Sequence, residues 1–105
     1  MFLVTQNLHF FINSALKKTL LILEPVTKAC PGLRDALFLL AKARYLAGDI
    51  KAAMGTLQHV VDNLDPTLAE AHLLMAQIQL HQVMHLKYEY NFQEDVGKAE
   101  LGRLN

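Results

Sequence analysis

The sequence predicts an all-α fold in which antiparallel helix pairs stack into a short α-solenoid. The first observation is an internal repeat, because the segment from Pro31 matches the segment from Pro66 when the chain is shifted by 35 residues. The second is the spacing of apolar residues by three and four in each copy, which is typical of one helix face. The third is Gly48-Asp49, which supplies a helix end and a helix cap between two such stretches.

The composition favours one small domain without a nucleic-acid partner. The chain has 105 residues, and its 10 Lys+Arg balance its 10 Asp+Glu. No basic surface for a polyanion is therefore expected. Cys30 is the only cysteine, so an intrachain disulfide is excluded and a reducing, cytoplasmic compartment is expected.

The N-terminal part is predicted to contain an apolar arm or helix over residues 1–13 and a helix of a degenerate preceding repeat over residues 14–30. Residues 1–16 carry no Asp, Glu, Lys or Arg. They lack the basic start of a secretory signal and are shorter than the roughly 18 to 20 apolar residues of a membrane span, so neither is expected. Pro25 is expected to kink or restart a helix.

Residues 31–66 are predicted to form one complete repeat, a helix pair. Pro31 suits a helix start, and Gly48 can take the positive φ that ends a helix. Asp49 can cap the second helix, which Pro66 stops. So short a connection requires antiparallel helices. The predicted inward stripes are Leu33, Leu37, Leu40, Ala41 and Arg44 in the first helix, and Ile50, Ala53, Met54, Leu57, Val60, Val61 and Leu64 in the second.

Two alanines stand on these stripes, although a larger side chain there would bury more area. We expect the two helix backbones to approach closely at Ala41 and Ala53. A larger side chain would over-pack this contact, at a cost of about 1 to 3 kcal/mol. Ala76 repeats the small residue in the second copy and supports the same packing.

Residues 67–82 are predicted to be the first helix of a next repeat, and residues 83–105 a tail outside the repeat pattern. Val83 stands where the turn glycine stood in the first copy. The tail can be written as a helix weakened by two glycines, or as a disordered segment. Its aromatic residues are expected to cover the exposed edge of the last helix; they are Tyr88, Tyr90 and Phe92.

The pattern of the complete repeat resembles a tetratricopeptide repeat. The matching residues are Leu37, Leu40, Ala41 and Arg44 in the first helix, Ala53 and Leu57 in the second, and Pro66 at the end. Tyr45 lies beside the usual aromatic position. The segment from Cys30 to Gln82 resembles the tetratricopeptide repeat protein 21 family, the tetratricopeptide-repeat subunit of intraflagellar transport complex A.

The resemblance implies a non-enzymatic protein–protein interaction module of the cytoplasm and cilium. Its expected partners are other subunits of intraflagellar transport complex A, and its expected role is in retrograde ciliary transport and cilium assembly. Two alternatives stay open. One is a free-standing adaptor that binds chaperones or other peptides, and the other is a small helical carrier of a metal or ligand.

The resemblance also implies a binding surface, because first helices line the inner wall of a stacked array. The residues expected on this concave face are Asp35, Phe38, Lys42, Tyr45, Leu46, Glu70, Leu73, Gln77 and Leu80. A clamp for a C-terminal carboxylate is disfavoured, because Phe38 and Leu73 stand where polar clamp residues are needed. The alternative role of Phe38 and Leu73 is packing against a neighbouring repeat.

No catalytic residue, cofactor or metal site is expected. His81 and His85 have helical i, i+4 spacing, but no third ligand follows at a suitable distance. The acids at the helix ends are expected to serve caps and turns; they are Asp49, Asp62, Asp65 and Glu70. Because the chain has fewer than the roughly three repeats of a stable array, we expect weak autonomous folding, self-association through unpaired helix faces, or dependence on a partner.

Overall fold

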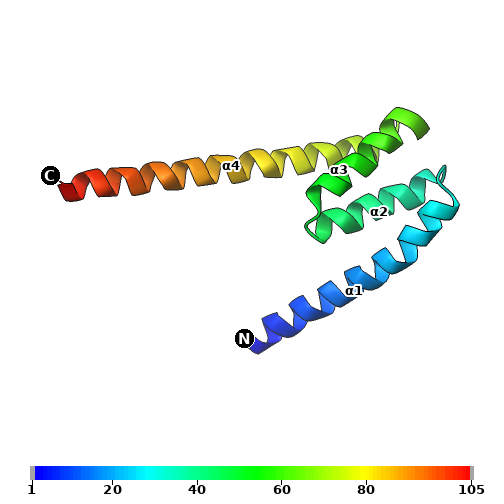
Figure 1. The fold of residues 1–105 in the computed structure, drawn as a ribbon, viewed down its shortest axis with the longest axis horizontal. Helices are drawn as coiled ribbons and strands as arrows, with labels where there is room; N and C mark the ends of the chain where they lie inside the picture. Colours follow the sequence, from blue (N-terminus) through cyan, green and yellow to red (C-terminus); the bar gives the residue numbers. More distant parts are fainter. Residues whose placement is uncertain (1, 105) are drawn as a thin grey trace. The chain divides into compact units, whose positions relative to one another are not determined.

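The computed structural model describes the backbone of residues 2–104 and the side chains of residues 6–91 (Figure 1). These residues are helical with short connections and include no strand, so the all-α prediction is confirmed. The chain divides into two units, residues 1–75 and residues 76–105. The elements are α1 (Phe2–Ala29), α2 (Arg34–Leu46), α3 (Ile50–His59), the π-helical turn η1 (Val60–Leu64) and α4 (Ala69–Leu104).

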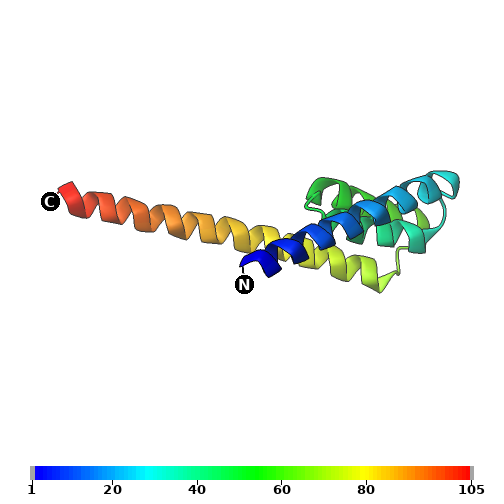
Figure 2. The ribbon, with the colours of Figure 1, turned by 90° about the horizontal axis from the view of Figure 1, so that it is seen from below.

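The connection between α2 and α3 forms as the sequence predicts. Gly48 has a φ of 90°, the left-handed conformation in which glycine avoids the clash of a Cβ. Its N–H donates to the carbonyl of Tyr45 at 3.0 Å, which closes the end of α2. Asp49 caps α3, because its side chain accepts a hydrogen bond from the backbone N–H of Ala52 at 3.2 Å. The turn therefore fixes α2 and α3 as neighbouring antiparallel helices (Figures 1 and 2).

The core of the first unit lies where α2, α3 and η1 pack together. Ala41 and Ala53 have no exposed surface, as expected for small residues in a tight helix contact. Leu57 and Val60 are equally buried. Leu37, Leu40 and Val60 form a cluster, and the partly buried residues packed against it are Leu20, Leu23, Leu64 and Leu68.

The predicted stripes are mostly confirmed. Every residue of the α3–η1 stripe is buried or half-buried, as are Leu37, Leu40, Ala41 and Arg44 of the α2 stripe. Leu33 is the exception at 49% exposure, because it lies before the first turn of α2 rather than on the packed face. The sequence prediction was wrong for this residue.

Arg44 occupies a half-buried position between α2 and α3, where its charged head has a polar partner. Its Nη1 donates to the Oγ1 of Thr56 at 2.7 Å, and this hydroxyl donates to the carbonyl of Ala52 at 2.8 Å. The long stem of arginine can cover apolar surface while its head stays hydrogen-bonded. The hydroxyl therefore allows a cation at a position that the repeat pattern usually gives to an aromatic residue.

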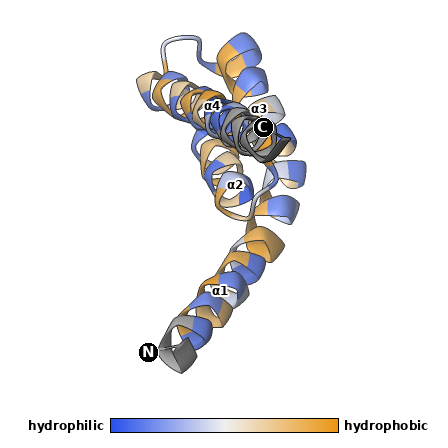
Figure 3. Cartoon of the chain, turned by 90° about the vertical axis from the view of Figure 1, so that its left-hand side faces the viewer, coloured by the Kyte–Doolittle hydropathy of each residue, from blue (hydrophilic) through white to orange (hydrophobic). Residues whose placement is uncertain are grey.

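Residues 2–29 form one helix, so the division expected after residue 13 falls inside α1. α1 continues through Pro25 to Ala29, and no second helix starts at the proline. Its packing is one-sided: Leu20 and Leu23 reach the core, whereas Phe10 and Leu21 are 77% and 72% exposed. Apolar residues lie on more than one side of α1 (Figure 3), which leaves apolar surface without a partner among the described residues.

α4 also continues past a helix end predicted from the sequence, the one at residue 82. Val83 stands where Gly48 ends α2, but a β-branched residue cannot easily take a positive φ, so the helix continues to Leu104. Within the part of the chain that the structure describes, no helix folds back over Ala76; its side chain is exposed, so its expected place in a helix contact was wrong. Tyr88 and Tyr90 are 71% and 69% exposed and cover no helix edge, contrary to the prediction; the side chain of Phe92 lies outside the described residues.

Replacing Ala53 by phenylalanine tests the close contact of α2 with α3. Ala53 is fully buried, so we expect Ala53→Phe to over-pack the core and lower the free energy of unfolding by at least about 1 to 3 kcal/mol. The measurement is thermal unfolding followed by circular dichroism. Ala76→Phe is the matched control on an exposed helix surface and should change stability by less than about 0.5 kcal/mol. Equal melting of the parent and Ala53→Phe would contradict the packing described here.

Candidate protein-binding surface

Four of the predicted surface residues form one row along α2. Asp35, Phe38, Lys42 and Tyr45 recur at intervals of three and four, which places them on the same side of the helix. The Asp35 side chain is 83% exposed and Lys42 is exposed, whereas Phe38 and Tyr45 are half-buried. Leu46 follows at the end of the helix and is 66% exposed. We call these five residues the α2 row.

Phe38 and Lys42 act as a pair within the α2 row. The Lys42 ammonium lies 5.5 Å from the centroid of the Phe38 ring, a distance at which a cation is attracted to the ring face. The contact holds the lysine near the helix surface while leaving it exposed. The row therefore offers an apolar ring and a positive charge side by side.

The predicted residues on α4 are all exposed. Glu70 and Leu73 belong to the first unit, and Leu73 is 65% exposed. Gln77 and Leu80 belong to the second unit, and Leu80 is 58% exposed. Each unit therefore has one large apolar side chain of α4 exposed to water: Leu73 in the first unit and Leu80 in the second.

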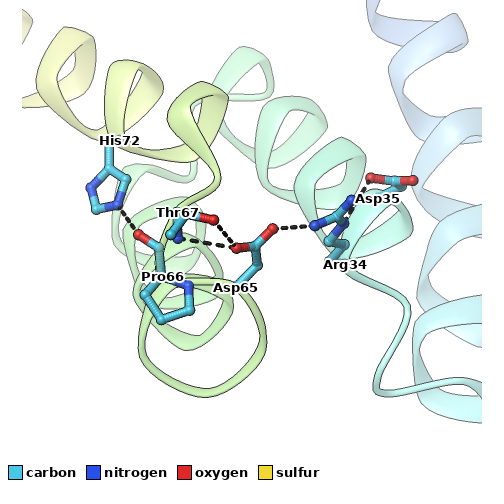
Figure 4. A network of polar contacts seen from close by, with 6 residues as sticks. All are labelled: Arg34, Asp35, Asp65, Pro66, Thr67 and His72. Atoms are coloured by element: carbon cyan, nitrogen blue, oxygen red, sulfur yellow. Dashed lines mark hydrogen bonds and ion pairs between the residues drawn. The ribbon is translucent and has the colours of Figure 1, made fainter.

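A polar network ties the start of α2 to the turn that precedes α4 (Figure 4). Arg34 Nη1 forms an ion pair and hydrogen bond with Asp65 Oδ2, across 31 residues of sequence. Arg34 Nε also lies 3.8 Å from Asp35 Oδ1, the first member of the α2 row. The guanidinium therefore links the row to the end of the repeat.

The turn itself is closed by Asp65 and Thr67. Asp65 Oδ1 accepts hydrogen bonds from the Thr67 backbone N–H at 3.0 Å and from the Thr67 hydroxyl at 2.7 Å. This arrangement is an Asx turn, in which a carboxylate imitates a backbone carbonyl. His72 Nε2 lies 2.7 Å from the Pro66 carbonyl and binds it in the tautomer that carries the proton on Nε2 (Figure 4).

These contacts lower the pKa of Asp65 below its ordinary value. The Thr67 hydroxyl is the largest cause, followed by the Thr67 backbone N–H, and the charge of Arg34 adds to them. The sequence predicted a turn role for Asp65, because this acid stands at a helix end just before Pro66. Nothing in the sequence indicated that Arg34 pairs with Asp65, because an ion pair between residues far apart in the chain depends on how the helices pack.

A groove between α1 and α2 was also missed by sequence reasoning. It has a volume of about 410 Å³, and two members of the α2 row, Lys42 and Leu46, line it. The other lining residues are Leu16, Thr19, Ile22 and Leu23 from α1, and Leu39 and Ala43 from α2. Because the lining from α1 comes from a separate helix, only the packing of α1 on α2 could reveal this groove.

The side chain of His85, on α4, has a carboxylate beside it. His85 Nε2 lies 3.1 Å from Glu89 Oε1, and both side chains are exposed. Among the side chains that the structure describes, no group of three or more His, Cys, Asp or Glu could hold a metal ion. Over the same part of the chain, no helix is both long and apolar enough to cross a membrane.

The paired helices, the repeated segment and the exposed rows define a helical-repeat module for protein interaction. Comparison with known proteins agrees: residues 8–83 match a model of the second ARM domain of tetratricopeptide repeat protein 21. The chain belongs to the tetratricopeptide repeat protein 21 family. This confirms the resemblance found in the sequence.

Individual relatives give the extent of the similarity. The chain is 45% identical over 71 residues to tetratricopeptide repeat protein 21B of Mus musculus, covering 68% of this chain and 5% of that protein. It is 39% identical over 90 residues to tetratricopeptide repeat protein 21A of Homo sapiens, covering 78% of this chain and 7% of that protein. The chain thus spans only a small part of the length of these relatives. No solved structure matches it.

The Asp65 network predicts a pH-dependent contribution to stability. Since folding lowers the pKa of Asp65, the carboxylate stabilises the fold at neutral pH, and this contribution is lost as pH falls through the lowered pKa. We expect Asp65→Asn to lower Tm at pH 7 and to have a smaller effect at about pH 3. Asp62→Asn, which removes an exposed carboxylate from η1, is the control for charge. An Asp65→Asn effect of equal size at both pH values would contradict the network's role.

Proposed function

We propose that this chain is a non-enzymatic protein-interaction module of the scaffold that carries out retrograde ciliary transport. Its partners would be other subunits of intraflagellar transport complex A, met in the cytoplasm and the cilium. The observation that carries this proposal is the family match over residues 8–83. The family resemblance supplies the ciliary role, and the chain supplies the exposed helix rows through which such a role can act.

The surface we propose for partner binding comprises the predicted residues of the first unit, the α2 row with Glu70 and Leu73; Gln77 and Leu80 of the second unit are proposed as contacts of that unit by itself. Leu46 and Leu73 are large apolar residues with most of their surface in water, and burying them against a partner would be favourable. Asp35, Lys42 and Glu70 add single charges of both signs among them. Such a mixture suits an extended peptide or a neighbouring helix.

The α2 row also bears on the alternative of a chaperone adaptor. A clamp for a terminal carboxylate needs several donors directed at one point. Lys42 is paired with the ring of Phe38, and Leu73 has no donor at all. The row therefore supports recognition of a partner with apolar side chains better than recognition of a free carboxylate.

Reversing the charge of Lys42 tests the proposed surface. Lys42 is exposed, so we expect Lys42→Glu to leave the fold intact and to lower the recovery of complex A subunits about fivefold, the effect of roughly 1 kcal/mol. The measurement is affinity purification of the full chain from ciliated cells, with circular dichroism to check folding. Lys51→Glu makes the same change on the exposed surface of α3 and should bind like the parent chain.

Two results would count against the proposal, and they are distinct. Equal recovery with Lys42→Glu and Lys51→Glu would contradict the α2 row as the contact surface. Failure of the parent chain to recover any complex A subunit would contradict the ciliary scaffold role itself.

A further inference from the structure

α4 is the longest of the described helices, and its greater part lies in the second unit. It has 36 residues and continues without interruption from Ala69 to Leu104 (Figure 1). Helices of globular domains typically have about 8 to 20 residues, and a much longer one is typical of a coiled coil. The second unit comprises residues 76–105, so it contains about four fifths of this helix. A helix of this kind gains most of its stability by packing one face along another helix.

One face of α4 in the second unit carries residues at heptad spacing. They are Ala76, Leu80, Val83, Lys87 and Tyr90, which alternate at intervals of four and three. All five are exposed, and the three large apolar ones are 58%, 61% and 69% exposed in chain order. The same spacing places the a and d side chains of a two-stranded coiled coil on the side that faces the partner helix. We call these five residues the α4 seam.

The face of α4 opposite the seam is polar. Its residues lie about half a turn away from the seam and are His81, Gln82, His85 and Glu89. The contact of His85 Nε2 with Glu89 Oε1 at 3.1 Å links two successive turns of this polar face. Met84 and Leu86 lie between the two faces. Water can therefore solvate the polar face while the seam packs on a second helix.

The α4 seam extends beyond the part of the chain that matches the family. That match covers residues 8–83, so Lys87 and Tyr90 follow it. Gly48 ends α2 in the first copy of the repeat, whereas α4 continues through the equivalent Val83. The seam depends on this continuation of the helix and not on the stacking of one repeat on the next.

Lys87 determines which orientation of two α4 helices is favourable. In a parallel pair in register, each seam residue faces its own counterpart, so Lys87 would face the Lys87 of the second copy. Two like charges directly opposite each other destabilise such a contact. A polar residue at one a position is also a known means of setting register and orientation in a coiled coil. The parallel arrangement is therefore disfavoured.

An antiparallel pair removes this conflict. When Leu80 of one copy faces Val83 of the other, Ala76 faces Lys87, and two-fold symmetry repeats both contacts. The long lysine stem can then lie over the small alanine while its ammonium group reaches water. The two central layers are filled by leucine and valine. The α4 seam is thus complementary to itself in size, and it keeps its like charges apart.

The length of the seam determines how strong such a contact can be. From Ala76 to Tyr90 the seam measures about 21 Å at the helical rise of 1.5 Å per residue. This is two heptads, and an interface of that length lies at the lower end of the range for specific protein contacts. We therefore expect a reversible dimer with a Kd of about 10 to 100 μM.

We propose that two copies of this chain associate through the α4 seam, as an antiparallel pair of helices in which Lys87 of each copy lies over Ala76 of the other. The partner of this surface is a second copy of the chain. This inference rests on the proposed role in protein interaction, and it names the partner of the second unit.

Sedimentation equilibrium of the purified full chain tests the seam. Leu80→Asp places a charge in a central layer, and we expect it to weaken the dimer at least about tenfold. Leu21→Asp is the matched control, because it makes the same change at an exposed leucine of α1, and its Kd should stay within about twofold of the parent value. Circular dichroism checks that both variants fold.

A second variant tests the orientation and does not depend on a loss of association. Ala76→Glu puts a carboxylate opposite Lys87 in the antiparallel pair, twice by symmetry, and we expect a dimer about fivefold tighter, with the gain lost in about 1 M salt. In a parallel pair the same change would put two carboxylates opposite each other and weaken the dimer. Gln82→Glu adds the same charge on the polar face and should change the Kd less than about twofold.

Several results would overturn the inference. These are a parent chain that stays monomeric at about 1 mM, equal association of the Leu80→Asp and Leu21→Asp variants, or a weaker dimer with Ala76→Glu. Loss of association with Leu21→Asp alone would assign the contact to α1 instead. Binding to phosphatidylserine-containing vesicles that Leu80→Asp abolishes, in a chain that stays monomeric, would assign the seam to a membrane surface.

The design separates this inference from the proposed function. Only the purified chain is present, so the result does not depend on ciliary subunits. A monomeric chain would overturn the α4 dimer and leave the ciliary role in place. Failure to recover complex A subunits from cells would do the reverse.

Discussion

The structure depends on how closely α2 can approach α3. Ala41 and Ala53 are completely buried in this packing, and their methyl groups let the larger Leu37, Leu40 and Leu57 close around the contact. The turn at Gly48 sets the antiparallel direction that makes the approach possible. With α2 fixed in this way, its outer side presents the α2 row and one wall of the α1–α2 groove.

Because this core is small, many apolar side chains elsewhere in the chain remain exposed to water. The packed pair covers Leu20 and Leu23 of α1 but leaves Phe10, Leu21 and others in water, and Leu80 and Tyr88 of α4 are similarly exposed. A stacked helical array buries such faces against neighbouring repeats. This chain spans only a small part of its relatives' length.

The sequence predicted the repeat pair well because its signals are local. Gly48, Asp49 and Pro66 act within one or two turns of the backbone, and the apolar spacing acts along one helix. The Arg34–Asp65 pair and the α1–α2 groove could not be predicted, since they depend on which helices pack together. Ala76 shows the limit of the repeat argument. It matches Ala41 in sequence, but α4 continues through Val83 without a turn, and no second helix folds back over Ala76 among the described residues.

Amide hydrogen exchange of the full chain tests the central role of the α2–α3 contact most directly, because it reports local opening residue by residue. The account predicts the slowest exchange in α2 and α3, centred on Ala41 and Ala53, and fast exchange near Phe10 and Tyr88. Amides around Ala41 and Ala53 that exchange as fast as those around Tyr88 would contradict it, because the helix pair would then not be the stable centre of the fold.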